Sequence, residues 1–229
     1  AGMQLELCTP LAGGPKTVEE RAAALDVSPL RLRPLLYALV TAELLTVEDG
    51  RFANSAEAAH YLVKGKPGYI GGQHEAYSDL WSATLQTAQS IRANMPQARH
   101  DFSAMSHDDL RAFVRGLDAG AGAAARRLLR SYDIGRFRHA LDAGGGSGGL
   151  AITLCRDCPD LHATIADLPN VAAISREFIA EAGMADRIAV IDADLVAAPP
   201  AGRYDLAVLR ALLQVLGPDD AARVVRPQH

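Results

Sequence analysis

The feature that most constrains this chain is a glycine-rich run from Gly144 to Gly149. It follows the short apolar stretch His139–Ala143 and precedes residues with the apolar spacing of a helix. Glycines before a helix let the backbone approach a ligand closely, and the free amides of the first helical turn then face that ligand. The run therefore predicts a strand, a ligand-binding loop and a helix.

The residues after 139 alternate between short apolar runs and stretches of helical spacing. The candidate strands lie within the segments HALDA, HATIADL, RIAVIDADL and YDLAVLRALL, and the candidate helices lie near 148–157, 170–182 and 218–225. Strands that alternate with helices are typical of a parallel sheet. We expect Asn170 to cap the second of these helices and Gly183 to end it.

Three predicted strands end in acidic residues. Asp142 lies two residues before Gly144, where its carboxylate can accept hydrogen bonds from a cationic amino-acid group. Asp167 comes 19 residues after Gly148 (167 − 148), the usual place for a carboxylate that binds two ribose hydroxyls. Asp194, close after the third strand, can meet an adenine amino group. The pattern favours a nucleoside-bearing cofactor over a glycine turn flanked by solvated acids.

The first half has the pattern of a winged helix. Thr17 and Glu20 form a capping box before a short helix that ends by Leu25, and a second helix follows with Ser28 as its N-cap and Pro29 at its first position. The extended runs 44–47 and 51–53 flank Asp49-Gly50, a pair that favours a tight hairpin turn. Helix, helix and hairpin in this order predict a mainly α domain.

A connecting segment joins the two halves. Residues 64–68 suggest a hinge, residues 73–94 suggest one long helix that Pro96 would end, and residues 106–131 suggest a further helix. We therefore place a first domain at 1–98, which includes the connecting helix, and a second domain at 99–229.

Composition excludes several classes of protein. With 229 residues and a formal net charge of −4, the chain lacks the positive excess that would hold it on nucleic acid or an anionic membrane. It has no apolar run of membrane-spanning length and no signal peptide, and its three cysteines are too few for a disulfide framework, so we expect a cytoplasmic protein. Cys155 and Cys158 are interpreted as ordinary helix thiols, and no metal site is predicted.

At this point the second half resembles the class I methyltransferase fold. The segment LDAGGGSGGLA is similar to the glycine motif of the small-molecule O-methyltransferases of plant caffeate and bacterial polyketide type, and IADLPNV is similar to their second-strand motif. The resemblance covers nearly the whole chain. It implies an α/β, Rossmann-like methyltransferase domain preceded by a winged-helix dimerisation domain, with a homodimer, S-adenosylmethionine as cofactor and a small-molecule acceptor from secondary metabolism.

The same resemblance implies roles for individual residues. Gly144 and Gly146 would flank the methionine part of the cofactor, Asp167 the ribose, and Asp194 the adenine, and Leu168 is a further candidate to contact the cofactor. Arg210 would take the place of a lysine near the cofactor. The resemblance also implies that the chain lacks the family's first dimerisation helices and everything after the fourth strand and its helix, so we expect further residues beyond both ends.

The chain departs from the family at the catalytic histidine, because Gln214 stands where that base is expected. An amide has no lone pair that titrates near neutral pH, so Gln214 can orient an acceptor but cannot deprotonate it. We therefore expect S-, N-, C- or activated O-methylation, with a thioether sulfur as an extreme case, since such acceptors need alignment more than proton removal.

An ordinary O-methyltransferase remains the alternative, with its base elsewhere. His74, Tyr77 and Trp81 have the spacing to share one side of the long helix, and with Arg115 they are candidates to hold the acceptor; the same helix face could instead pack on its own partner domain. Two other readings stay open. One is a winged-helix DNA-binding regulator, although Arg31 and Arg33 alone would supply few of the phosphate contacts that groove binding needs. The other is a methyltransferase scaffold that catalyses a different reaction.

Overall fold

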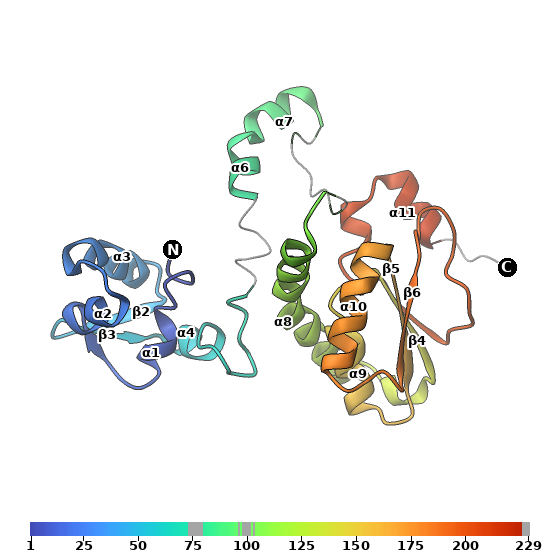
Figure 1. Ribbon diagram of the computed structural model, residues 1–229, viewed down its shortest axis with the longest axis horizontal. Coiled ribbons are helices and arrows are strands. Elements are labelled where there is room, and N and C mark those ends of the chain that lie inside the picture. The colour runs from blue at the N-terminus through green and yellow to red at the C-terminus, as the bar shows by residue number, and fades with distance from the viewer. Residues whose placement is uncertain (73–79, 96, 98–101, 103, 226–229) are drawn as a thin grey trace. The chain divides into compact units, whose positions relative to one another are not determined.

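The computed structural model describes residues 1–72, 80–95, 97, 102 and 104–225, and within this range the side chains of 80–82 are left aside (Figure 1). The chain forms two compact units, Ala1–His74 and Glu75–His229. The boundary predicted from the sequence, after residue 98, lies later because that prediction includes the connecting segment in the first domain. Each unit has its own hydrophobic core.

The first unit contains the predicted helices and hairpin. Its elements are α1 (Cys8–Leu11), β1 (Lys16–Thr17), α2 (Val18–Leu25), α3 (Pro29–Thr41), β2 (Leu45–Glu48), β3 (Arg51–Asn54) and α4 (Ala56–Tyr61). The strands form an antiparallel sheet in the order β1-β3-β2. The element order is the one that predicted a winged helix, and the role of this unit in dimerisation stays a prediction.

Local signals set the turns of this unit. The capping box is present, because the Thr17 hydroxyl accepts the Glu20 amide at 3.1 Å and the Glu20 carboxylate accepts the Thr17 amide at 2.7 Å. Asp49 and Gly50 both have positive φ, 48° and 72°, as the hairpin required. Ser28 precedes α3 as predicted, but its side chain makes no capping hydrogen bond.

The long connecting helix predicted over 73–94 is wrong for the part that is described. Residues 80–93 form two short helices, α6 (Leu80–Leu85) and α7 (Thr87–Ala93), with a turn at Gln86 between them (Figure 1). The Thr87 hydroxyl donates to the Thr84 carbonyl at 2.7 Å. A side-chain hydroxyl that bonds to a nearby carbonyl competes with the helical ladder, which accounts for the interruption.

The second unit is an α/β domain with a parallel sheet, as predicted. Its elements are α8 (His107–Ser131), η1 (Ile134–Arg136), β4 (His139–Ala143), α9 (Gly149–Asp157), β5 (His162–Asp167), α10 (Pro169–Glu181), β6 (Ile188–Asp192), β7 (Leu206–Val208), η2 (Leu213–Val215) and α11 (Pro218–Val225). The strand order is β6-β5-β4-β7, with every pair parallel. The helices α9 and α10 pack on this sheet, and α8 packs along α9 (Figure 1).

The helix α10 begins one residue earlier than predicted. Its N-cap is Leu168, with Pro169 in the first turn, so Asn170 is not the cap. The Asn170 amide instead donates to the Phe102 carbonyl at 2.7 Å, a contact 68 residues away in sequence. Gly183, with φ 66°, lies just beyond the end of the helix as expected.

Glycines let α8 approach the glycine loop. A β-carbon at Gly122 of α8 would lie 3.3 Å from the Thr153 hydroxyl of α9, so the two helices are in close contact there. At the first residue of α9, a β-carbon on Gly149 would lie 3.0 Å from the Asp118 carbonyl of α8. The start of α9, where a ligand would meet the free amides, is thus held directly against α8.

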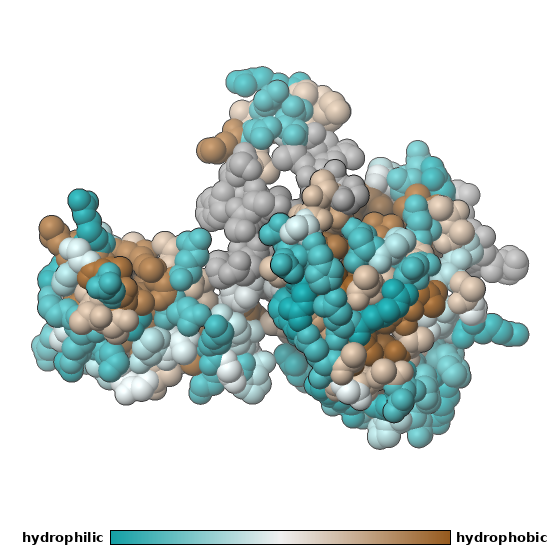
Figure 2. Space-filling view, viewed as in Figure 1, coloured by the Kyte–Doolittle hydropathy of each residue, from teal (hydrophilic) through white to brown (hydrophobic). Residues whose placement is uncertain are grey.

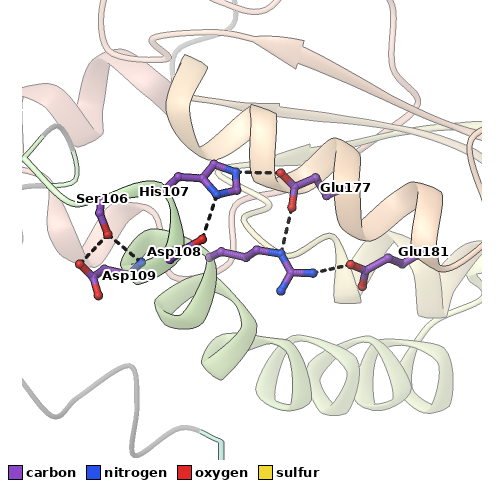
Figure 3. A network of polar contacts seen from close by, with 7 residues as sticks. Ser106, His107, Asp108, Asp109, Glu177 and Glu181 are labelled. Atoms are coloured by element: carbon purple, nitrogen blue, oxygen red, sulfur yellow. Dashed lines mark hydrogen bonds and ion pairs between the residues drawn. The ribbon is translucent and has the colours of Figure 1, made fainter.

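A second contact joins α8 to α10. His107 of α8 contacts Glu177 of α10, and Arg111, also of α8, contacts both Glu177 and Glu181 (Figure 3). The His107 Nε2 lies 2.8 Å from a Glu177 carboxylate oxygen, and the Arg111 Nε donates to the other oxygen at 2.9 Å. Hydrogen bonds from Arg111 and then from His107 lower the pKa of Glu177. These side chains are partly exposed, so the contact orients the two helices more than it stabilises the fold.

Candidate functional site

The glycine loop between β4 and α9 needs glycine at several positions. Gly144, Gly146 and Gly148 have φ of 70°, 54° and 73°, in the left-handed region that side chains disfavour. A β-carbon at Gly145 would lie 2.8 Å from the Asp142 carboxyl carbon, and one at Gly148 would lie 2.8 Å from Ile179 Cδ1. Gly146 is different, because its nearest neighbour would be Val114 Cγ1 at 4.0 Å. The backbone is therefore open to a ligand at Gly146.

Asp142 is buried beneath this loop. It is the penultimate residue of β4, its exposed fraction is 3%, and its Oδ2 has no hydrogen-bond partner among the described residues. Burial, and next the charge of Asp167, raise the pKa of Asp142 to about 7. The Ala151 amide and then Arg210 act in the opposite direction. A buried carboxyl with an unused oxygen is costly unless a donor or a cation meets it, so Asp142 is suited to receive a ligand's positive group.

Asp167 ends the neighbouring strand β5 and contacts the same loop. Its Oδ2 accepts the Gly146 amide at 2.9 Å, and its Oδ1 accepts the Leu168 amide at 2.8 Å. Burial raises the pKa of Asp167, and the amides of Gly146 and Leu168 oppose that effect. Each carboxylate oxygen keeps further acceptor capacity, so this side chain can also receive hydroxyl groups.

Two acids follow the third strand, and the structure distinguishes them. Asp192, the last residue of β6, accepts a hydrogen bond from Arg176 at 2.7 Å. Asp194 is exposed, and its Oδ1 accepts the amides of Val196 and Ala197 at 3.0 and 3.2 Å, which fixes the side chain in its own turn. Asp142 and Asp167 thus lie in the last residues of β4 and β5, and Asp194 follows β6, so all three are at the carboxyl edge of one sheet, where ligands of open α/β sheets bind.

The residues after β7 flank this edge. Arg210 is partly buried, and with Arg127 and Leu150 it lines a hollow between α8, α9 and β7. Ala211 has φ 59°, a rare conformation for alanine that marks a sharp turn after the strand. Leu212 then packs near Gly144, at 3.2 Å from where a β-carbon would be. Gln214 follows in η2 and is exposed.

The structure leaves the proposed acceptor-binding helix face undescribed. His74 and Tyr77 lie outside the described residues, and so does the side chain of Trp81. Arg115, the fourth candidate to hold the acceptor, donates to Glu181 and lies over the Phe178 ring at 3.7 Å, both on α10, and its role toward an acceptor stays a prediction. It joins α8 to α10.

Sequence reasoning missed two contributors to the loop. Ser175, buried in α10, donates from its hydroxyl to the Gly146 carbonyl at 2.6 Å. Val114 of α8 packs nearest the open side of Gly146. Both come from helices distant in sequence from the loop; a serine on the buried face of a predicted helix was the one available signal.

Metal ligands, membrane-spanning helices and reactive thiols are the remaining features that bear on function. In the part of the chain that the structure describes, no three histidine, cysteine or acidic residues are placed to hold a metal ion, and no helix has the length and apolar character to cross a membrane. The CxxC thiols are unpaired and buried at the end of α9, and burial raises the pKa of Cys155 to about 11. A raised pKa makes this thiol a poor nucleophile.

The burial of Asp142 predicts a pH dependence of stability. Because its folded pKa of about 7 lies above the usual value, the folded state holds a proton that the unfolded state releases, and the free energy of unfolding falls as pH rises from about 4 to 7. Asp142→Asn should remove this dependence, so in urea unfolding without ligand the variant should gain stability over the wild type as pH rises.

The matched control is Asp205→Asn, because the pKa of Asp205 is shifted in the opposite direction to that of Asp142. Hydrogen bonds from the Arg138 and His139 amides lower the pKa of Asp205, so its contribution is present above about pH 4 and is lost in acid. This variant should be less stable than the wild type near neutral pH. Equal pH profiles for the wild type and Asp142→Asn would contradict the assignment of a buried, proton-binding Asp142.

Comparison with known proteins adds family membership to this geometry. Residues 85–220 match the family described as the O-methyltransferase domain. The 3-hydroxy-5-methyl-1-naphthoate 3-O-methyltransferase of Streptomyces sahachiroi is 34% identical over 93% of this chain and 63% of its own length. The 8-amino-8-demethylriboflavin N,N-dimethyltransferase of Streptomyces davaonensis is 30% identical over 97% of this chain and 67% of its length.

A solved structure shows the same fold. Human N-acetylserotonin methyltransferase in complex with SAM has a TM-score of 0.79 to this chain, at 20% identity, over 97% of this chain and 68% of that one. The chain thus spans about half to two thirds of the length of the curated relatives it matches. The resemblance noted in the sequence is confirmed, and this chain belongs to the O-methyltransferase-domain family.

Proposed function

We propose that this protein binds S-adenosylmethionine and transfers its methyl group to a small-molecule acceptor. The observation that carries the proposal is the buried carboxylate oxygen of Asp142, which has no partner in the described part of the chain and lies beside an open glycine loop. An unsatisfied buried acceptor of this kind favours a ligand that brings a cationic group. Membership in the family and relatives named as O- and N-methyltransferases support the same activity.

The proposed roles follow the strand ends. Asp142 would accept the ammonium group of the methionine part, and Gly144 and Gly146 would let the backbone approach it. Asp167 would hold the ribose, with Leu168 beside it, and Asp194 would meet the adenine. Arg210, whose charge already favours the ionised form of Asp142, would balance the negative charge of the site. When bound, the cofactor supplies an electrophilic methyl group; the protein aligns the acceptor with it.

For the acceptor, we propose a nucleophile that needs no proton removal by residue 214. Gln214 is an exposed amide and is not a base. An amine, thiolate, thioether, activated carbon or already ionised oxygen fits this requirement, and a relative named as an N,N-dimethyltransferase supports it. The naphthoate 3-O-methyltransferase supports the second candidate, O-methylation of a phenol with a base elsewhere in the chain, such as His74 or Tyr77.

Replacement of Asp167 tests the cofactor site. Asp167→Ala removes a charge-assisted acceptor worth roughly 1.5 to 3 kcal/mol, so the affinity for S-adenosylhomocysteine should fall by about tenfold or more. Isothermal calorimetry measures this change directly. The control is Asp192→Ala, which removes a carboxylate one strand away that is already paired with Arg176. Unchanged affinity in Asp167→Ala would exclude the ribose role.

An acceptor screen tests the base-independent mechanism. Phenols, amines, thiols and thioethers would be offered with labelled cofactor to the wild type and to Gln214→Ala. We expect methylation of acceptors that carry a free lone pair and little change on substitution, because the amide moves no proton. Fast methylation of phenols together with a loss of more than roughly a hundredfold in Gln214→Ala, the effect of removing a positioned acid or base, would contradict the mechanism.

We propose further that the protein is a cytoplasmic homodimer without nucleic-acid contacts, and that the first unit provides the interface. Figure 2 shows hydrophobic side chains at the surface of this unit. Leu30 and Tyr37, seven residues apart on α3, are 77% and 46% exposed. Against a role in DNA binding, Arg33 on the same helix pairs with Glu19 at 3.0 Å. The unpaired cysteines fit a reducing compartment.

The proposed interface predicts that a charged substitution on α3 lowers the mass of the particle in solution. Leu30→Asp places a charge on the exposed apolar face of α3, so light scattering at micromolar concentration should show a shift from dimer toward monomer. Glu48→Lys, an exposed charge change in the hairpin of the same unit, should leave the dimer intact. A wild type that is monomeric, or an unaffected Leu30→Asp dimer, would exclude this interface.

A further inference from the structure

Ser175 occupies an unusual place for a serine. It lies in the middle of α10, and its exposed fraction is 0%. A buried serine contributes little apolar contact and is a weaker helix former than alanine, so its hydroxyl needs a compensating bond. Two carbonyls are in reach: that of Val171, four residues earlier, at 3.0 Å and that of Gly146 in the glycine loop at 2.6 Å. The shorter contact is the tertiary one.

With the Ser175 hydrogen bond, both backbone polar groups of Gly146 are hydrogen-bonded. The Gly146 amide donates to the Asp167 carboxylate at 2.9 Å, while its carbonyl accepts from Ser175. Pro169, the first residue of α10, follows Asp167 after a single residue, so the strand end and the helix hold the loop from one continuous segment. The left-handed φ of 54° at Gly146 is thereby maintained by a hydrogen bond on each side of the residue.

We propose that Ser175 is a positioning residue for cofactor binding, which acts by holding the Gly146 carbonyl so that the Gly146 amide stays on the Asp167 carboxylate. The inference rests on the proposed cofactor site. The hydroxyl touches no ligand itself. It fixes the direction of the carboxylate that faces the ribose, and it keeps the open side of Gly146 in the shape that the ligand meets. Without it, the loop and Asp167 can separate, and the ligand must order both on binding.

Binding of S-adenosylhomocysteine, measured by calorimetry, tests the inference. Ser175→Ala removes a single neutral hydrogen bond, so affinity should fall by roughly two- to tenfold. The affinity of Ser175→Cys, whose thiol has a similar size but is a weak donor, should lie between those of the wild type and Ser175→Ala. The matched control is Thr153→Val, because the Thr153 hydroxyl also donates to a carbonyl four residues earlier, that of Gly149 at 2.7 Å, but does not touch the Gly146–Asp167 pair. It should bind like the wild type.

A double-mutant cycle separates positioning from a general effect on the fold. If Ser175 acts through Asp167, the Ser175→Ala substitution should cost less than about twofold when Asp167 is already alanine. Thermal unfolding checks that each variant is folded; if Ser175→Ala is not, Ser175→Cys replaces it in the cycle. Losses that multiply, or a folded Ser175→Ala with unchanged affinity, would overturn the inference alone. No binding by the wild type would overturn the proposed function and the inference together.

Discussion

The buried carboxyl of Asp142 constrains the glycine loop above it and the ligand that the loop can accept. Taking a carboxyl out of water while one of its oxygens has no described partner is unfavourable, and its pKa of about 7 reflects this cost. The surrounding chain accommodates it closely, because Gly145 cannot carry a side chain without meeting it. A site that bears this cost in the free protein fits the proposed binding of a cationic ligand better than it fits maximal stability.

The glycine loop is held by elements on all sides. Asp167 of β5 binds the Gly146 amide, Ser175 of α10 binds its carbonyl, and Leu212 after β7 packs near Gly144. The helix α8 packs against the start of α9 and is joined to α10 by the contacts of His107 and Arg111 (Figure 3). The loop is thus held by contacts from several elements of the second unit, as expected of a largely pre-formed binding site.

The segments of the proposed cofactor site resemble those of the family, but position 214 does not. The acids and glycines of the proposed cofactor site lie in segments that resemble the family's motifs, whereas the position expected to hold the base carries an exposed amide. Electrophilic methyl transfer needs the donor and acceptor to be aligned, and proton removal is an added requirement only for acceptors that arrive protonated. A family can therefore keep one cofactor site while its acceptors range from oxygen to nitrogen, as the names of the relatives indicate.

The sequence by itself determined the features that depend on local spacing. The hairpin strands, the parallel strands, the glycine loop, the strand-end acids and the Asp49-Gly50 turn were predicted, because alternation and glycine placement act within a few residues, whereas the two-residue strand β1 was not. Only the tertiary structure decided which distant groups meet. Asn170 bonds to the Phe102 carbonyl instead of capping its helix, Arg115 pairs with α10, and Ser175 reaches the loop. Such partners lie 29 to 68 residues apart, and no local pattern encodes which helix faces will be brought together when the sheet and its helices pack.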